Sequence, residues 1–159
     1  MSWSDRRDDE QCCAGPLGGV GSEESVARLL HSKIAVPEQA AFTRKELTGE
    51  GSVSNECGKQ SGCSVDRASG LSQEDILVRA KALAEAKTGR KSEGAFLASA
   101  KDLRRIAHEE IPQAVLIYDD AKSDNDRHAV LRVHSSVPKT DFGLIRNAIM
   151  KAFSRRILP

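Results

Sequence analysis

The residues best suited to chemistry lie between positions 119 and 128, where carboxylates and a histidine occur close together. Asp119 and Asp120 follow one apolar run, His128 opens the next, and Asp124 and Asp126 lie between them. Carboxylate oxygens are preferred ligands of hard cations such as Mg²⁺, and a histidine can act as a ligand or general base. Asp119, Asp120 and His128 are therefore the candidate catalytic residues of a metal-dependent hydrolase or nuclease.

The same residues also suit a solvated turn, because Asp and Asn side chains stabilise turns by bonding to their own backbone. The spacing does not match an EF-hand loop, which needs alternating ligands, a central glycine and a terminal glutamate. The sequence has no serine nucleophile elbow, phosphate loop or dinucleotide fingerprint. We therefore expect no cofactor, and we keep the hydrolase as the alternative to a protein without catalysis.

Four cysteines give the ligand count of a structural zinc site. Cys12 and Cys13 are adjacent, whereas five residues separate Cys57 from Cys63. Zinc modules usually bring paired ligands two to four residues apart, and neither pair has this form. We therefore expect no metal, and four reduced thiols if the protein is cytoplasmic.

The composition indicates a globular protein of 159 residues, with 39% hydrophobic and 30% charged residues. Aromatic residues make up only 4%, which argues against a base-stacking platform for single-stranded nucleic acid. No apolar run approaches the roughly 20 residues that span a bilayer. The acidic N-terminal residues lack the pattern of a signal peptide. We therefore expect a cytoplasmic protein with no membrane attachment.

The net charge is only +1, but the charge is unevenly distributed. Residues 1–25 contain two basic and six acidic residues, whereas residues 139–159 contain five basic and one acidic. The candidate partner-binding residues are therefore the basic ones near the C-terminus: Arg146, Lys151, Arg155 and Arg156. We expect them to meet a protein partner, with weak nucleic-acid binding by the same basic helix as a third hypothesis.

A sheet is needed to position these residues. Apolar and alternating runs predict strands at residues 26–30, 63–67, 95–98, 114–119 and 128–134. In the last strand, alternation puts His128, Val130 and Arg132 on the wetter face.

Two principal helices are expected to pack on one side of this sheet. The first covers residues 72–87, with Ser72 as its N-cap and Gly89 closing it. The last helix starts at Thr140 or Asp141, and its apolar stripe consists of Phe142, Ile145, Ile149 and Phe153. Short helical turns are expected at residues 42–47 and after Ser99.

The sequence thus predicts an α+β fold, with a small, mostly antiparallel sheet packed by two main helices after a disordered N-terminal arm. The arm covers residues 1–22, and a single domain covers residues 23–159, with a Gly/Ser-rich loop near residues 48–63. The function expected first is that of a small cytosolic binding or adaptor protein acting through a protein partner.

Overall fold

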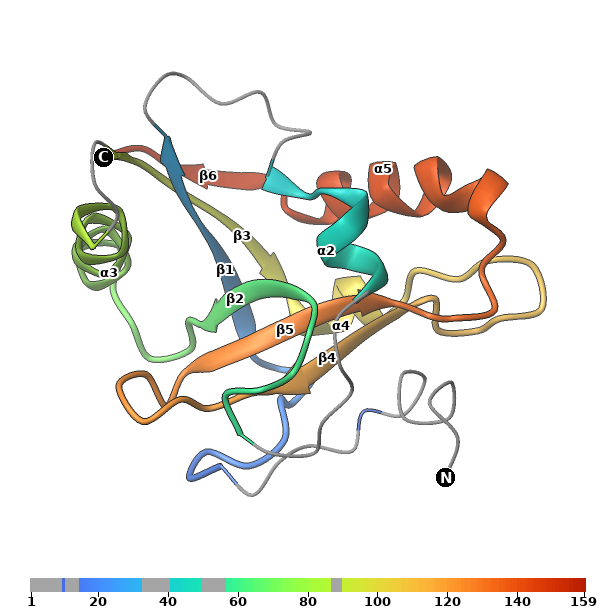
Figure 1. The fold of residues 1–159 in the computed structure, drawn as a ribbon, viewed down its shortest axis with the longest axis horizontal. Helices are drawn as coiled ribbons and strands as arrows, with labels where there is room; N and C mark the ends of the chain where they lie inside the picture. The colour runs from blue at the N-terminus through green and yellow to red at the C-terminus, as the bar shows by residue number, and fades with distance from the viewer. Residues whose placement is uncertain (1–9, 11–14, 33–40, 50–56, 87–89) are drawn as a thin grey trace.

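The computed structural model describes residues 10, 15–32, 41–49, 57–86 and 90–159 (Figure 1). These ranges form a six-stranded antiparallel sheet in the order β4-β5-β2-β1-β3-β6. The strands are β1 (Ser25–Ser32), β2 (Cys63–Arg67), β3 (Lys91–Ser99), β4 (Val115–Asp119), β5 (His128–Val133) and β6 (Arg155–Ile157). The helices are α2 (Arg44–Thr48), α3 (Gln73–Glu85), α4 (Ala100–Arg104), α5 (Phe142–Ala152) and the 3-10 helix η2 (Lys139–Asp141). The predicted α+β class is confirmed.

The helix starts follow local capping chemistry. The Ser72 hydroxyl accepts a hydrogen bond from the Asp75 backbone N–H, and the Asp75 carboxylate accepts one from the Ser72 N–H. This capping box satisfies N–H groups that the first turn of α3 would leave unbonded. Ser99 caps α4 by accepting from the Asp102 N–H. The predicted closing residue Gly89 lies outside the described residues.

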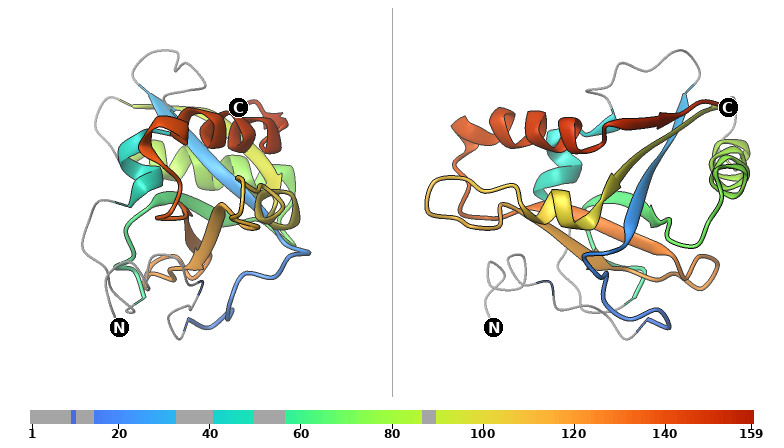
Figure 2. Two further views of the ribbon diagram at one scale, coloured as in Figure 1. Left: turned by 90° about the vertical axis from the view of Figure 1, so that its right-hand side faces the viewer. Right: turned by 180° about the vertical axis from the view of Figure 1, so that it is seen from behind.

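The two principal helices, α3 and α5, cover opposite faces of the sheet, which corrects the expectation of a single helical layer (Figure 2). The larger apolar cluster includes Val26 from β1 and Ile149 from α5. A second cluster, on the other face, includes Ala27 from β1 and Ile76 from α3. Because β1 carries apolar side chains on both faces, each face requires its own cover.

The strand pair β4–β5 is also buried on both faces, so the face predicted to be wetter is dry. Arg132 is fully buried, with its guanidinium 5.1 Å from the centre of the Tyr118 ring. Its Nε donates to the backbone oxygen of Ser61. The segment that includes Ser61 belongs to the Gly/Ser-rich loop, whose composition gave no sign that it would cover a sheet.

Part of the predicted N-terminal arm contacts the domain, while residues 1–9 and 11–14 lie outside the described residues. The Glu10 carboxylate accepts from the Ile117 N–H of β4 at 2.8 Å and from Arg104 Nη2 at 3.0 Å. The carbonyl oxygens of Gly18 and Gly19 accept from the guanidinium of Arg67. Disorder of the arm as a whole stays a prediction.

Across the described ranges, no helix is long and apolar enough to cross a membrane.

Candidate ligand site

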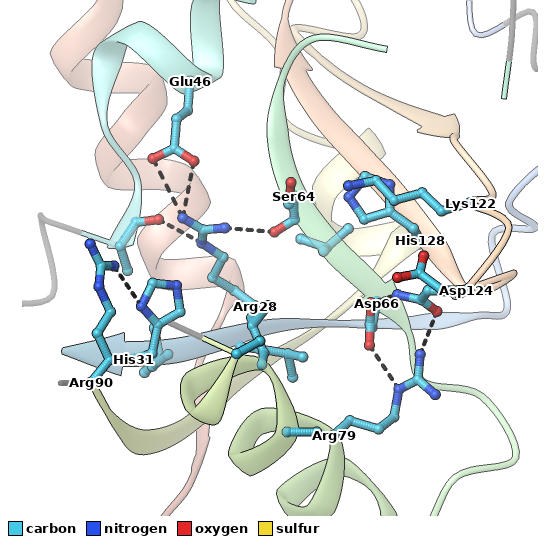
Figure 3. Close-up of a pocket in the computed structure, with 18 residues that line it drawn as sticks. Arg28, His31, Glu46, Ser64, Asp66, Arg79, Arg90, Lys122, Asp124 and His128 are labelled. Atoms are coloured by element: carbon cyan, nitrogen blue, oxygen red, sulfur yellow. Dashed lines mark hydrogen bonds and ion pairs between the residues drawn. The ribbon is translucent and has the colours of Figure 1, made fainter. Parts of the chain in front are cut away.

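A cleft of about 770 Å³ opens where β1 and β2 diverge (Figure 3). The two strands pair only through Val26 with Arg67 and Ala27 with Asp66, although β1 remains paired with β3 along its length. Residues of α2, α3 and the turn before β5 form the other walls. The separation of two neighbouring strands therefore creates the site.

Arg28 compensates for the hydrogen bonds lost at this separation. Its Nη1 donates to the backbone oxygen of Ser64 and its Nε to that of Ala41, each at 2.8 Å. Its Nη2 lies 3.1 Å from the Glu46 carboxylate. The guanidinium thus satisfies a carbonyl that a continued β1–β2 ladder would have bonded. Arg28 is consequently neutralised, and it forms a fixed wall of the cleft.

His128 reaches the cleft from β5 in a fixed orientation. Its Nδ1 lies 2.9 Å from the backbone oxygen of Asp120 and 3.0 Å from that residue's Oδ2. Asp120 is fully buried, and its Oδ1 accepts from the Gln60 N–H at 2.9 Å. A proton on Nδ1 makes the hydrogen bond to the Asp120 carbonyl, so the neutral ring carries its lone pair on Nε2.

The other ring nitrogen of His128 is the unusual atom of the cleft. His128 is only 7% exposed, and its Nε2 is buried without a hydrogen bond to any described residue. A buried polar atom left unpaired costs about 1–3 kcal/mol. Because His128 lines the cleft, an occupant with an N–H or O–H group could satisfy this atom.

The charged side chains of the cleft differ in how far they are already paired. Arg79 bonds Asp66 at 2.8 Å and Asn125 at 2.5 Å, and Arg90 contacts the ring of His31. The side chain of Lys122 is exposed and makes no ion pair or hydrogen bond within the described part of the chain. In the view of Figure 3 the side chain of Lys122 overlaps the His128 ring, and Ser64 is to the left of them. Lys122 is therefore the cation that an anionic ligand would meet beside His128.

The predicted catalytic residues are only partly brought together. Asp120 and His128 are paired, but Asp119 is buried on the opposite face, 3.3 Å from Arg67 Nη1. Burial raises the pKa of the Asp119 carboxyl, and the charge of Arg67 opposes this increase. Asp124 is exposed and joins no metal-ligand cluster found among the described residues.

A separate group, formed by His108, Glu109 and Asp141, has side-chain ligand atoms within 4.8 Å of one another. His108 Nε2 lies 3.0 Å from Asp141 Oδ2, whereas Glu109 is exposed. The sequence gave no signal for this group, because a turn and a helix start far apart in the chain supply it. Its geometry alone does not identify a metal site.

The predicted partner-binding residues divide between α5 and β6. Lys151, Arg155 and Arg156 are exposed, whereas Arg146 is half-buried. They lie away from the cleft, and none of them lines it.

The cysteines differ from the expectation of four reduced thiols. Cys57 is disulfide-bonded, and its partner lies outside the described residues. Cys63 is a buried free thiol, and burial raises its pKa to about 11. Cys12 and Cys13 are not among the described residues.

The cleft therefore combines an oriented histidine, an exposed lysine and walls fixed by ion pairs. No protein family, curated protein or solved structure matches the chain.

Proposed function

We propose that this protein binds a small anionic molecule in the cleft between β1 and β2. The observation that carries this proposal is the buried Nε2 of His128, which has no hydrogen-bond partner among the described residues while Asp120 holds Nδ1. The ligand donates a hydrogen bond to Nε2 and presents a carboxylate or phosphate to Lys122. Binding sites typically combine a concave surface with a few convergent polar groups of this kind.

The volume and charge of the cleft limit the class of ligand. About 770 Å³ is within the usual range for small-molecule sites. Arg28 and Arg79 already pair with Glu46 and Asp66, so the cations of the lining without a carboxylate partner among the described residues are Lys122 and Arg90. This supports a ligand that has one anionic group and a nearby N–H or O–H group.

A thermal-shift series with inorganic phosphate, pyrophosphate, citrate and adenosine monophosphate tests the proposal. A ligand that binds only the folded protein raises Tm. We expect at least one of these anions to raise Tm in the native protein, with a smaller increase in His128→Asn and Lys122→Glu. Asn replaces the Nδ1 donor but provides no acceptor at the position of Nε2, so the contact with Asp120 is kept.

Lys81→Glu is the matched charge control, because Lys81 is exposed on α3 and lies outside the cleft lining. Its response to the anions should equal that of the native protein. Unchanged Tm with all four anions at millimolar concentration, or equal responses in native protein and His128→Asn, would contradict the proposal.

Hydrolysis is a second candidate function, favoured by a serine on the same face as His128. Ser64 pairs with Val130 and Asp66 with His128, so Ser64 and His128 are diagonal neighbours on adjacent strands. Both line the cleft. A histidine with a carboxylate oxygen 3.0 Å from Nδ1 and a serine on the adjacent strand resembles the arrangement that activates serine nucleophiles. Labelling by a fluorophosphonate probe should then be lost in Ser64→Ala, and a native protein that resists the probe would exclude this function.

A cytoplasmic location is also proposed, on the basis of the sequence alone. The disulfide at Cys57 argues against it, because structural disulfides are rare in that compartment. Cell fractionation with an antibody to the protein tests whether it is cytoplasmic.

A further inference from the structure

Strand β6 forms one edge of the sheet, and no described strand covers its outer side. It pairs with β3 through Arg155 with Leu97, Arg156 with Phe96 and Ile157 with Ala95, and it is last in the strand order. No strand of the described chain pairs with its other side. An unpaired edge presents backbone N–H and C=O groups to which another extended chain can bond.

A hollow of about 270 Å³ lies beside this edge, lined by residues of α5, β3 and β6, by Phe153 and Ser154, and by Phe42, which precedes α2. Its apolar lining includes Phe42, Phe96, Met150 and Phe153, and the rings of Phe42 and Phe153 are 4.9 Å apart. Lys151 and Arg156 complete the charged part of the lining. The hollow can therefore accept an apolar side chain from a segment that also carries negative charge.

The basic residues at this edge are not neutralised by the described chain. Lys151, Arg155 and Arg156 are exposed and form no ion pair with described residues. Arg156 lies over the Phe96 ring at 5.3 Å and donates to the backbone oxygen of Glu93. Because successive side chains of a strand point to opposite faces, Arg155 and Arg156 flank the open edge from both faces of the sheet.

We propose that an acidic, extended segment of a partner protein adds to the outer edge of β6. Its backbone bonds the strand, an apolar side chain enters the hollow, and its carboxylates contact Lys151, Arg155 and Arg156. Strand addition of this type obtains affinity from main-chain hydrogen bonds and specificity from side-chain pockets. A nucleic acid would use the positive charge but would leave the backbone groups of the strand edge without a partner strand.

Fluorescence anisotropy with the full-length chain and a labelled peptide, Glu-Asp-Glu-Leu-Glu-Asp-Glu, tests the proposal. We expect saturable binding that weakens at least tenfold in the double variant Arg155→Glu/Arg156→Glu. The double variant Lys81→Glu/Lys101→Glu changes the net charge equally at exposed positions outside the hollow. It should bind the peptide within about twofold of the native protein, since most of the charge effect is local at physiological salt.

Two altered peptides separate strand addition from charge attraction alone. Replacing the leucine by glycine should weaken binding by removing the side chain for the hollow. Methylating alternate backbone nitrogens should weaken it further by removing donors to the strand edge. The proposal would be overturned by equal affinity of the unmodified and methylated peptides or by absence of binding at millimolar peptide. Stronger binding of a poly-uridine oligonucleotide at the same residues would also overturn it.

This site is independent of the cleft. His128→Asn should therefore leave peptide binding unchanged, so failure of one proposal does not imply failure of the other.

Discussion

At the scale of single residues, burial decides which reactive groups of this protein can react. Cys63 is a thiol on a central strand, yet it is completely buried. The sequence pattern is consistent with a solvated turn at Asp119. In the structure, however, its carboxylate is buried against Arg67. Each of these environments leads to a measurable prediction.

Cys63 should be unreactive in the folded protein. Its pKa is raised to about 11 by burial, so at pH 8 only about one thiol in a thousand is the reactive thiolate. We expect Cys63 not to react with Ellman's reagent under native conditions and to react rapidly in 6 M guanidinium chloride. The difference between the native protein and the Cys63→Ala variant gives the part of the signal that is due to Cys63. Rapid labelling of Cys63 in the native protein would show that its strand opens readily.

Asp119 should make the stability of the protein depend on pH in a defined direction. Its pKa is raised in the folded state, so folding favours the protonated form. The contribution to stability is present below the unfolded pKa, near 4, and declines as the pH rises through the folded pKa. Relative to Asp119→Asn, the native protein should thus lose stability from about pH 4 upward. Urea melts of both proteins between pH 3.5 and 7 measure the difference, and parallel curves would contradict the assignment.

At the scale of elements, α5 shows most directly how a sequence pattern determines the free energy of unfolding. Ile149 is fully buried in the middle of its apolar stripe, whereas Leu144 on the same helix is 64% exposed. Ile149→Ala should lower the free energy of unfolding by about 2–5 kcal/mol, through lost transfer energy and the cavity left behind. Leu144→Ala should change it by less than about 0.5 kcal/mol. Denaturant melts give both values, and similar values for the two variants would mean that α5 packs differently.

The elements show which parts of the fold can be predicted from sequence. All five predicted strands are confirmed, as are both principal helices, the cap at Ser72 and the short helix after Ser99, because periodicity and capping are local signals. Strand β6 was missed because its three residues, two of them exposed arginines, have no apolar alternation. It becomes a strand by pairing with β3, which no local pattern reveals.

The candidate site was predictable only where its residues are near in sequence. Asp120 and His128 flank one turn, so their pairing follows from the predicted hairpin. The cleft itself depends on Arg28, which bonds Ser64 in another strand and Glu46 in α2. Contacts between such distant segments depend on packing, so they cannot be predicted from the composition or from the spacing of residues.

At the scale of the whole molecule, contacts of the N-terminal segment change what truncation should do. The sequence predicts a disordered arm at residues 1–22, and removal of such an arm should leave the fold intact. However, Glu10 bonds β4 and the carbonyl oxygens of Gly18 and Gly19 accept from the buried Arg67. A chain starting at Gly21 should therefore melt several degrees lower than the full chain, since each lost kcal/mol lowers Tm by roughly 2–4 °C for a protein of this size. A chain starting at Glu10 provides the control, and equal Tm values for the two would restore the original prediction.

The two edges of the sheet differ, and this difference limits how copies of the protein can associate. On β4, the Glu10 carboxylate occupies the Ile117 N–H and the Gln113 side chain occupies the Val115 carbonyl. On β6, no strand of the described chain occupies the outer edge. Growth of a filament by strand pairing needs two available edges per molecule, one to receive and one to offer. A sheet with a single available edge can at most form closed pairs in this way, so association of copies by strand pairing should stop at dimers.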